Sequence, residues 1–424
     1  MQRVIVPNVC ADEFKGENFN CLVQVIEQTR QATSGDTVVW DFRDVTTLHP
    51  FFLAPLAIFR QQSAQDIRCE NISLQMQSFL NGIHFDRMLH FENATREAAE
   101  QVMAQYADRN YIPLCSFSMT DGNKDAFCSI ARNIIVRQTH VGSAINTSVS
   151  YFLSELIDSI YEHSGSPDGY LFSQYLERDQ SINLCIADNG VTIPGNYQRL
   201  GLYQQEIDGD PAEALRLANE GRSTKNRPET ENRGYGFSTS KRMLVEGLNG
   251  SFFMLLGSAF HRYENHSLNY YADISRFFHW DGTLILLRIP VNAPMDSTIS
   301  ITSNEKTTKD MTQTIKLYDI CHADLFSRAK AALLVENINP KADRVILDFE
   351  GITFMSRSFT DELYNIVIDF PEKDFLYIHR NDDIRIMMEK VADGRNRNRQ
   401  LGIPPAQMLS FNSPSELADF LVMQ

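Results

Sequence analysis

Glu155, Ser159 and His163 stand four residues apart in one segment near the middle of the chain. In a helix this spacing brings the three side chains onto one face. The apolar residues of the segment recur on the opposite face, where they can pack against a sheet: Val149, Phe152, Leu153, Leu156, Ile157 and Ile160. The pattern predicts a helix over residues 147–163 that presents a carboxylate and a hydroxyl, groups able to bind a hard cation.

A second group of residues follows a predicted strand at residues 181–188. Apolar residues alternate along this strand, and Asp188 ends it. Gly190 comes two residues later, where the missing side chain lets the backbone pass close to another group. Thr283 opens a later predicted strand directly after a glycine. An Asp-Asn-Gly sequence on its own is usually only a turn, so this group gains meaning from the motifs around it.

Positive charge gathers in the polar segment before Phe237, although the chain carries a net charge of −15. The basic residues there are Arg222, Lys225, Arg227 and Arg233. Gly234 and Gly236 flank Tyr235 just before a predicted helix, where a tight turn and exposed backbone N–H groups favour a phosphate. A solvated loop would explain the charges alone, but the charges and glycines together predict a polyphosphate site.

In this order, the three groups of residues strongly resemble the motifs of the GHKL ATPase superfamily. That superfamily includes gyrase-type ATPases, the heat-shock chaperone, histidine kinases and anti-sigma serine kinases. The resemblance covers residues 155–290 and implies an α/β fold, an α+β sandwich of the Bergerat type, with ATP and Mg²⁺ as cofactors. No phospho-acceptor histidine motif precedes this domain, which speaks against a histidine kinase.

The resemblance assigns the helix residues to catalysis and metal binding. Glu155 takes the position that orients or deprotonates the attacking water, and it would reach Mg²⁺ through water. Ser159 stands where the superfamily normally has an asparagine that holds Mg²⁺. A serine side chain is shorter by about one bond, so the metal would be held through water, and this departure puts efficient turnover in doubt. His163 shares the nucleotide-facing surface.

The resemblance assigns the strand-end residues to the adenine. Asp188 accepts a hydrogen bond from the adenine amino group, Gly190 passes close to the base, and Thr283 completes the site with its hydroxyl. The superfamily usually has a second glycine where this chain has Thr192. The loop is therefore stiffer, but the contact with the adenine is kept.

The basic segment corresponds to an ATP lid in this resemblance. The residues that would meet the γ-phosphate are Ser223, Thr224 and Lys225. The residues of the turn beside the nucleotide would be Gly234, Tyr235, Gly236 and Phe237. Closure of the lid would exclude water and report the nucleotide state to the rest of the protein.

The regions on either side of this domain share a pattern. When Asp41 is placed over Asp348 without gaps, the apolar positions that follow coincide, with Phe52 on Phe359. Each copy reads as a buried strand that ends in Asp-Phe, then a turn, then a helix. Any two α/β units share part of this pattern, but the match favours two related small domains. Both copies resemble the STAS fold of anti-sigma factor antagonists.

The STAS resemblance singles out one serine. In the antagonists, the strand–turn–helix junction presents a serine that a partner kinase phosphorylates. This position falls at Ser358 in the C-terminal copy, whereas the N-terminal copy has Phe51 there and offers no hydroxyl. A serine at a helix start is more often an N-cap than a phosphorylation site, so both interpretations of Ser358 stay open.

The sequence predicts three domains. They are a STAS-like α/β domain over residues 1–108, the ATP-binding domain over 109–293 and a second STAS-like domain over 315–424, with a linker rich in Ser and Thr over 294–314. The apolar runs are too short for a membrane span, no CxxC pair occurs, and the N-terminus lacks a signal-peptide core. We therefore expect a cytoplasmic protein, and its evenly acidic composition predicts no direct binding to nucleic acid or membrane.

Three functions stay open. The first is a slow, Mg²⁺-dependent ATPase whose lid closure controls how the STAS-like domains bind protein partners in a bacterial regulatory or defence system. The second is an anti-sigma-type serine/threonine kinase that acts on a STAS domain, including its own Ser358. The third is a non-catalytic nucleotide sensor, which Ser159 favours. Because GHKL ATPases often dimerise when ATP closes the lid, we also expect a nucleotide-linked homodimer.

Overall fold

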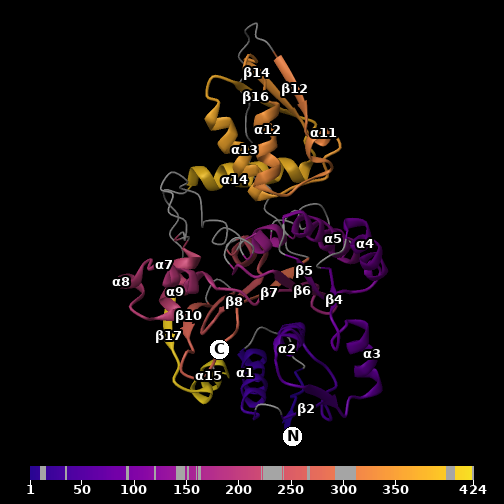
Figure 1. Cartoon of the computed structure of the whole chain (residues 1–424), viewed down its shortest axis with the longest axis vertical. Coiled ribbons are helices and arrows are strands. Elements are labelled where there is room, and N and C mark those ends of the chain that lie inside the picture. Colours follow the sequence, from indigo (N-terminus) through magenta and orange to yellow (C-terminus); the bar gives the residue numbers. More distant parts are fainter. Residues whose placement is uncertain are drawn as a thin grey trace. The chain divides into compact units, whose positions relative to one another are not determined.

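The computed structural model shows a mixed α/β chain with mixed sheets, which confirms the coarse fold class. It describes residues 1–9, 16–33, 36–91, 95–118, 121–139, 149, 152–158, 160, 164–220, 222, 241, 243–264, 268–291, 312–397 and 406–422 (Figure 1). The chain forms two compact units. Unit 1 comprises Met1–His140, Ile157–Ala293 and Pro404–Gln424, and unit 2 comprises Val141–Leu156 and Pro294–Ile403. Within the described residues, no helix combines the length and the apolar character needed to cross a bilayer.

Unit 1 begins with a small α/β layer. Its elements are β1 (Gln2–Ile5), α1 (Gly16–Arg30), β2 (Val38–Asp41), α2 (Pro50–Gln62), β3 (Ile67–Glu70) and α3 (Leu74–Gly82). The three strands form a parallel sheet in the order β1-β2-β3. Helix α2 starts with His49 as its N-cap and Pro50 in its first turn, a position where proline is well tolerated.

A nine-stranded sheet dominates unit 1. Its strands are β4 (Leu89–His90), β5 (Tyr111–Ser118), β6 (Asp168–Leu176), β7 (Ser181–Asp188), β8 (Ser251–Leu256), β9 (Ala259–Glu264), β10 (Leu268–Asp273), β11 (Thr283–Pro290) and β17 (Gln407–Ser410). Their order is β17-β10-β9-β8-β11-β7-β6-β5-β4. The edge pairs β4–β5 and β10–β17 are parallel, and all other pairs are antiparallel.

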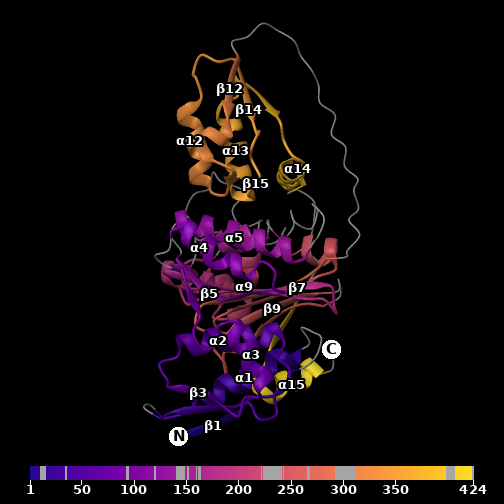
Figure 2. The same ribbon diagram turned by 90° about the vertical axis from the view of Figure 1, so that its right-hand side faces the viewer.

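Helices cover both faces of this sheet. The remaining helices of unit 1 are α4 (Arg96–Met103), α5 (Asp121–Thr139), α7 (Ile193–Leu200), α8 (Gln204–Ile207), α9 (Pro211–Asn219), α15 (Pro414–Val422), the 3-10 turn η1 (Ala104–Tyr106) and the π-helical turn η2 (Met243–Gly247). Figure 2 shows α5 on one face and α1 and α2 on the other. Alternate strand residues such as Cys185 and Phe253 join the α1–α2 core, which leaves the intervening residues to face the opposite side.

The C-terminal segment belongs to unit 1, whereas the sequence prediction placed residues 404–424 in the C-terminal domain. β17 pairs with β10 and forms one edge of the nine-stranded sheet. Leu417 and Leu421 of α15 are buried in the same core cluster as residues of α1 and α2. This burial and strand pairing explain why the segment returns to unit 1.

Unit 2 contains a second small α/β fold. Its elements are β12 (Thr312–Lys316), α11 (Leu317–Cys321), β13 (Asp324–Leu325), α12 (Arg328–Asn337), β14 (Arg344–Asp348), β15 (Phe354–Met355), α13 (Arg357–Asp369), β16 (Asp374–Ile378) and α14 (Asp382–Arg397). The parallel sheet has the order β12-β14-β16. Residues 312–314, which the prediction placed in the linker, belong to β12, and residues 292–311 lie outside the described part of the chain.

The predicted internal repeat is confirmed as a repeat of architecture. We call β1 through α3 the N-terminal repeat and β12 through α14 the C-terminal repeat. Both have a three-stranded parallel sheet in the same order, and α2 and α13 begin and end at matching positions of the gapless alignment. The short bridge Val9–Leu48 also has its counterpart in Leu325–Met355. The two strand-end aspartates, Asp41 and Asp348, therefore occupy equivalent places.

Candidate functional site

Asp188 ends β7, a central strand of the nine-stranded sheet, and its side chain is fully buried. One carboxylate oxygen, Oδ1, accepts a hydrogen bond from the backbone N–H of Gly190 at 2.7 Å. The other oxygen, Oδ2, is buried and accepts no hydrogen bond of ordinary length and angle among the described residues, although Thr283 lies close enough to this carboxylate to lower its pKa. A buried acceptor without a partner carries a large desolvation penalty, so this oxygen is suited to a donor supplied by a ligand.

Burial raises the pKa of Asp188 to about 6, although Gly190 and Thr283 act in the opposite direction. The cause is that a low-dielectric interior disfavours the charged carboxylate. At neutral pH the group is therefore mostly ionised but close to its titration range. Carboxylates with a strongly shifted pKa are common at functional sites.

Two glycines allow the backbone to close around Asp188. A Cβ atom on Gly190 would lie 2.2 Å from the carbonyl oxygen of Ser164, and one on Gly282 would lie 2.2 Å from the carbonyl oxygen of Asp188. Gly282 also has a left-handed φ of +99°, which disfavours any larger residue. Gly190 packs against the backbone of Ser164, while its predicted approach to the adenine base stays a prediction.

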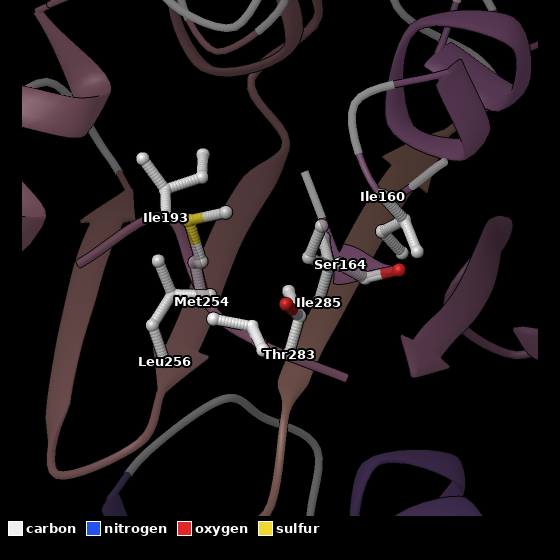
Figure 3. A pocket seen from close by; sticks show the side chains of 8 residues that line it. Ile160, Ser164, Ile193, Met254, Leu256, Thr283 and Ile285 are labelled. Carbon is white, nitrogen blue, oxygen red and sulfur yellow. The ribbon is translucent and has the colours of Figure 1, made fainter. Parts of the chain in front are cut away.

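A narrow pocket opens between the sheet and the segments around Ile160 and Val191 (Figure 3). Its lining residues are Ile160, Ser164, Val191, Ile193, Met254, Leu256, Thr283 and Ile285. The cavity has a volume of about 10 Å³, room for about one water molecule. Small-molecule pockets usually hold roughly 300–1,000 Å³, so the lining side chains would have to move to admit a base. Met254 is the lining residue most able to repack, because its side chain is unbranched and flexible.

The predicted site residue Thr283 lines this pocket, while the sequence analysis missed the apolar residues around it. Thr283 pairs with Leu256, and Ile285 pairs with Met254, across β11 and β8. Period-two alternation therefore places all four side chains on one face of the sheet. That alternation was the signal available in the sequence, but it does not show which strands become neighbours.

Glu155 lies in the helical residues 152–158 and falls in unit 2, which includes this stretch up to Leu156, whereas Ile157 begins the next part of unit 1. Its Oε2 atom is 3.6 Å from Nη1 of Arg357, and both side chains are almost entirely buried. Nε of Arg357 also donates to Oδ2 of Asp361 at 3.3 Å. The predicted general base is therefore ion-paired in this structure, with a partner that the sequence did not indicate.

Apart from Glu155, which was also predicted to reach Mg²⁺ through water, the predicted metal and phosphate residues fall outside the described part of the chain. These are Ser159, His163, Ser223, Thr224, Lys225, Gly234, Tyr235, Gly236 and Phe237. Arg222, at the edge of the predicted lid, is described. Its guanidinium lies over the ring of Tyr203 and 3.7 Å from Oε2 of Glu206, so part of its charge is balanced within the protein.

Ser358 is the second residue of α13 and is half-buried. The N-cap of this helix is Ser356, whose hydroxyl accepts a hydrogen bond from the N–H of Phe359 at 3.1 Å. The interpretation of Ser358 as the N-cap is therefore wrong. Its hydroxyl lies in the first helical turn, where added negative charge is favoured by the helix dipole.

A larger hollow lies elsewhere in unit 1, with a volume of about 420 Å³. Its lining residues are Val9, Thr47, Leu48, His49, Pro50, Asn110, Gln174, Leu176, Glu177, Arg178 and Asp179. None of the residues predicted for the nucleotide lines it. Size alone therefore does not favour the smaller pocket. Its chemistry does, because Thr283 lines it and interacts with the buried carboxylate of Asp188.

No known protein family matches the chain, and no curated protein matches it.

Proposed function

We propose that this protein binds ATP with the adenine against Asp188. The observation that carries this proposal is the buried Oδ2 atom of Asp188, which accepts no hydrogen bond of ordinary length and angle among the described residues. The adenine amino group is a donor of the kind this oxygen needs. The apolar side chains of Ile160, Met254 and Ile285 would contact the faces of the base.

The same geometry supports selectivity for adenine over guanine. Guanine carries a carbonyl oxygen where adenine carries its amino group, so guanine would set an acceptor against the Asp188 acceptor. A mismatch between buried polar groups discriminates strongly, because it leaves both groups without hydrogen bonds. Thr283, beside Asp188 at the start of β11, would contribute a hydroxyl that can donate or accept.

The proposed activity is slow Mg²⁺-dependent ATP hydrolysis of the GHKL type. Glu155 would accept a proton from the attacking water, and Ser159 would hold Mg²⁺ through water. Ser223, Thr224 and Lys225 would meet the γ-phosphate from a closing lid, whose state would control the binding of protein partners by the two repeats. A GHKL-type nucleotide-linked homodimer and a bacterial regulatory or defence role remain part of this proposal.

Specific observations favour each of the two other functions. The half-buried Ser358, which is not the N-cap of α13, favours an anti-sigma-type serine/threonine kinase that acts on this residue. The ion pair between Glu155 and Arg357 favours a nucleotide sensor without turnover.

One experiment distinguishes the three functions. Wild type, Glu155→Ala and Ser358→Ala are each incubated with Mg²⁺ and γ-labelled ATP. Free phosphate that disappears in Glu155→Ala supports the ATPase, label on the protein that disappears in Ser358→Ala supports the kinase, and binding without either product supports the sensor.

The adenine site is tested by Asp188→Asn, measured by calorimetric titration with ATP, GTP and adenosine. We expect affinity for ATP and adenosine to fall by roughly tenfold or more, which corresponds to about 1.4 kcal/mol or more. The asparagine keeps the shape of the side chain and removes a buried carboxylate whose pKa is raised to about 6. Stability that depends on a raised carboxyl pKa is lost as pH rises through that value, so at pH 7.5 the variant should not be less stable than wild type.

Asp179→Asn is the matched control, since Asp179 is a partly exposed residue of the turn between β6 and β7. It should leave adenosine binding unchanged. In wild type, adenosine affinity should also fall as pH drops below about 6, because protonation makes Asp188 a weaker acceptor. If ATP does not bind, or if Asp188→Asn binds ATP and adenosine as tightly as wild type, the proposed site is wrong.

A further inference from the structure

Arg357 stands between two carboxylates in unit 2. Its Nη1 atom is 3.6 Å from Oε2 of Glu155, and its Nε atom is 3.3 Å from Oδ2 of Asp361. The side chains of Arg357, Glu155 and Asp361 are 8%, 12% and 10% exposed. An ion pair that is shielded from water in this way is weakened little by salt and is costly to break from one side.

The position of Arg357 in its helix is unfavourable for a cation. Arg357 is the first residue of α13, directly after the N-cap Ser356. The positive end of a helix dipole lies there and disfavours positive charge. In the N-terminal repeat, the equivalent position holds Pro50, the first residue of α2. The repeated architecture therefore does not require an arginine here, which indicates that the residue is present for its carboxylate partners.

The ion pair with Arg357 limits the role of Glu155 as a proton acceptor in ATP hydrolysis, and the inference drawn from this rests on the proposed function. In ATP hydrolysis the water oxygen bonds to the γ-phosphorus while the bond to the β-phosphate oxygen breaks. ADP and phosphate result, and a proton of the water passes to the carboxylate. A carboxylate beside a guanidinium is stabilised in its charged form and is a poorer proton acceptor. A general base acts only when it lies within hydrogen-bond reach of the water.

We infer that Arg357 is a positioning residue that withholds the Glu155 carboxylate from the attacking water. Hydrolysis then requires this ion pair to open, so the C-terminal repeat restrains the ATPase through α13. When the Glu155–Arg357 pair opens, Arg357 keeps its ion pair with Asp361, which lies four residues later on the same helix. The guanidinium thus keeps one carboxylate partner in both states, which lowers the cost of release.

The test compares full-length wild type with Arg357→Gln, Arg357→Lys and the control Arg385→Gln. Arg385 lies on α14 of the same repeat, is about half exposed (51%), and pairs with Asp382 and Glu389 of its own helix. We expect Arg357→Gln to raise the rate of phosphate release by roughly tenfold, since a freed general base contributes at least this much, with affinity for ATP unchanged. Arg357→Lys keeps the charge and should stay near the wild-type rate, as should Arg385→Gln. The gain should vanish in Arg357→Gln/Glu155→Gln.

A second readout does not depend on hydrolysis. Hydrogen exchange of residues 152–158 without nucleotide should be faster in Arg357→Gln than in wild type, while Arg385→Gln leaves it unchanged. Arg357→Met serves the same purpose if the glutamine variant does not fold. Unchanged exchange would show that the pair does not hold this segment, and would overturn the inference even if no nucleotide bound and the proposed function failed.

The rates of phosphate release test whether Arg357 restrains Glu155. If Arg357→Gln binds ATP but releases phosphate no faster than wild type, or more slowly, Arg357 does not restrain Glu155 and the inference is wrong. If neither protein hydrolyses the ATP that it binds, the restraint is also wrong while the nucleotide site stands. If wild type binds no ATP, the proposed function fails, and the exchange measurement alone decides whether the pair holds residues 152–158.

Discussion

The N-terminal and C-terminal repeats share one architecture and use it differently. Helix α2 is buried over ten consecutive residues, Pro50–Phe59, and its side chains join the core beneath the nine-stranded sheet. Helix α13 has the same bounds in the alignment, but its buried positions include Arg357 and Asp361. The comparison shows that strand order and helix bounds can be kept while the start of one helix changes from apolar packing to paired charges.

The strand-end aspartates show the same contrast. Asp41 is ion-paired with Arg3 at 2.8 Å and with Arg43. Asp348 lies 2.8 Å from Nδ1 of His379, and no arginine pairs with it in the part of the chain that the structure describes. Each aspartate also binds the residue that follows the third strand, Asn71 or His379, and both of these residues have a left-handed φ. The repeats therefore share the hydrogen bond and differ in the surrounding charge.

The largest expected effect comes from Phe52→Ala compared with its equivalent Phe359→Ala. Both rings are fully buried, and each truncation should cost about 3–5 kcal/mol. Because Phe52 lies in the core shared with the nine-stranded sheet, its loss should also weaken ATP binding. Phe359→Ala should destabilise unit 2 and leave ATP affinity unchanged. Urea denaturation measures the free energy of unfolding, and calorimetric titration measures the affinity for ATP. Equal losses of ATP affinity in the two variants would contradict the idea that only the N-terminal repeat supports the nucleotide site.

The acid sensitivity of the repeats should differ by a smaller amount. Hydrogen bonds from Arg43, Asn71 and Arg3 hold the pKa of Asp41 far below its usual range, against the influence of burial. Burial opposes the shift at Asp348 too, but the Glu350 amide and His379 still lower that pKa. A lowered carboxyl pKa gives stability that is present above the unfolded pKa of about 4 and is lost as pH falls through the folded value.

Asp41→Asn should therefore flatten the loss of stability as pH falls from about 4 towards 2 more than Asp348→Asn does, because the difference between the folded pKa values acts at the acidic end of this range. Urea midpoints across this pH range measure the effect. Asp44→Asn is a control for the N-terminal repeat, since Asp44 is an exposed residue between β2 and α2. A larger change from Asp348→Asn would contradict the idea that the two arginines distinguish the repeats.

The smallest effect should come from the left-handed residues. Asn71→Gly and His379→Gly each relieve about 1–2 kcal/mol of backbone strain and lose a hydrogen bond worth about 0.5–1.5 kcal/mol. We expect changes in unfolding free energy below about 1 kcal/mol in both repeats. Asn71→Ala and His379→Ala lose the bond and keep the strain, so each should be less stable than its glycine variant. Equal stabilities of the alanine and glycine variants would show that φ at this position carries no strain.

The sequence predicted the repeat and the strand-end carboxylates because both follow from local pattern. Alternation located β7 with Asp188 at its end, and the gapless match of Asp41 to Asp348 located both helices. The same reasoning could not place β17, because four residues of mixed polarity do not specify which sheet edge they join. Arg357 was missed for a related reason, since its partner Glu155 lies two hundred residues away and no period in the sequence links them.

The return of β17 to the edge of the nine-stranded sheet also determines how the chain can be taken apart. Residues 294–403 are inserted within the path of unit 1, which resumes after them. A single cut in residues 294–311 would therefore leave the two fragments joined through the β10–β17 pairing and the buried leucines of α15. During synthesis, β10 cannot pair with β17 until the whole C-terminal repeat has been made. Unit 1 is therefore among the last parts of the protein to be completed.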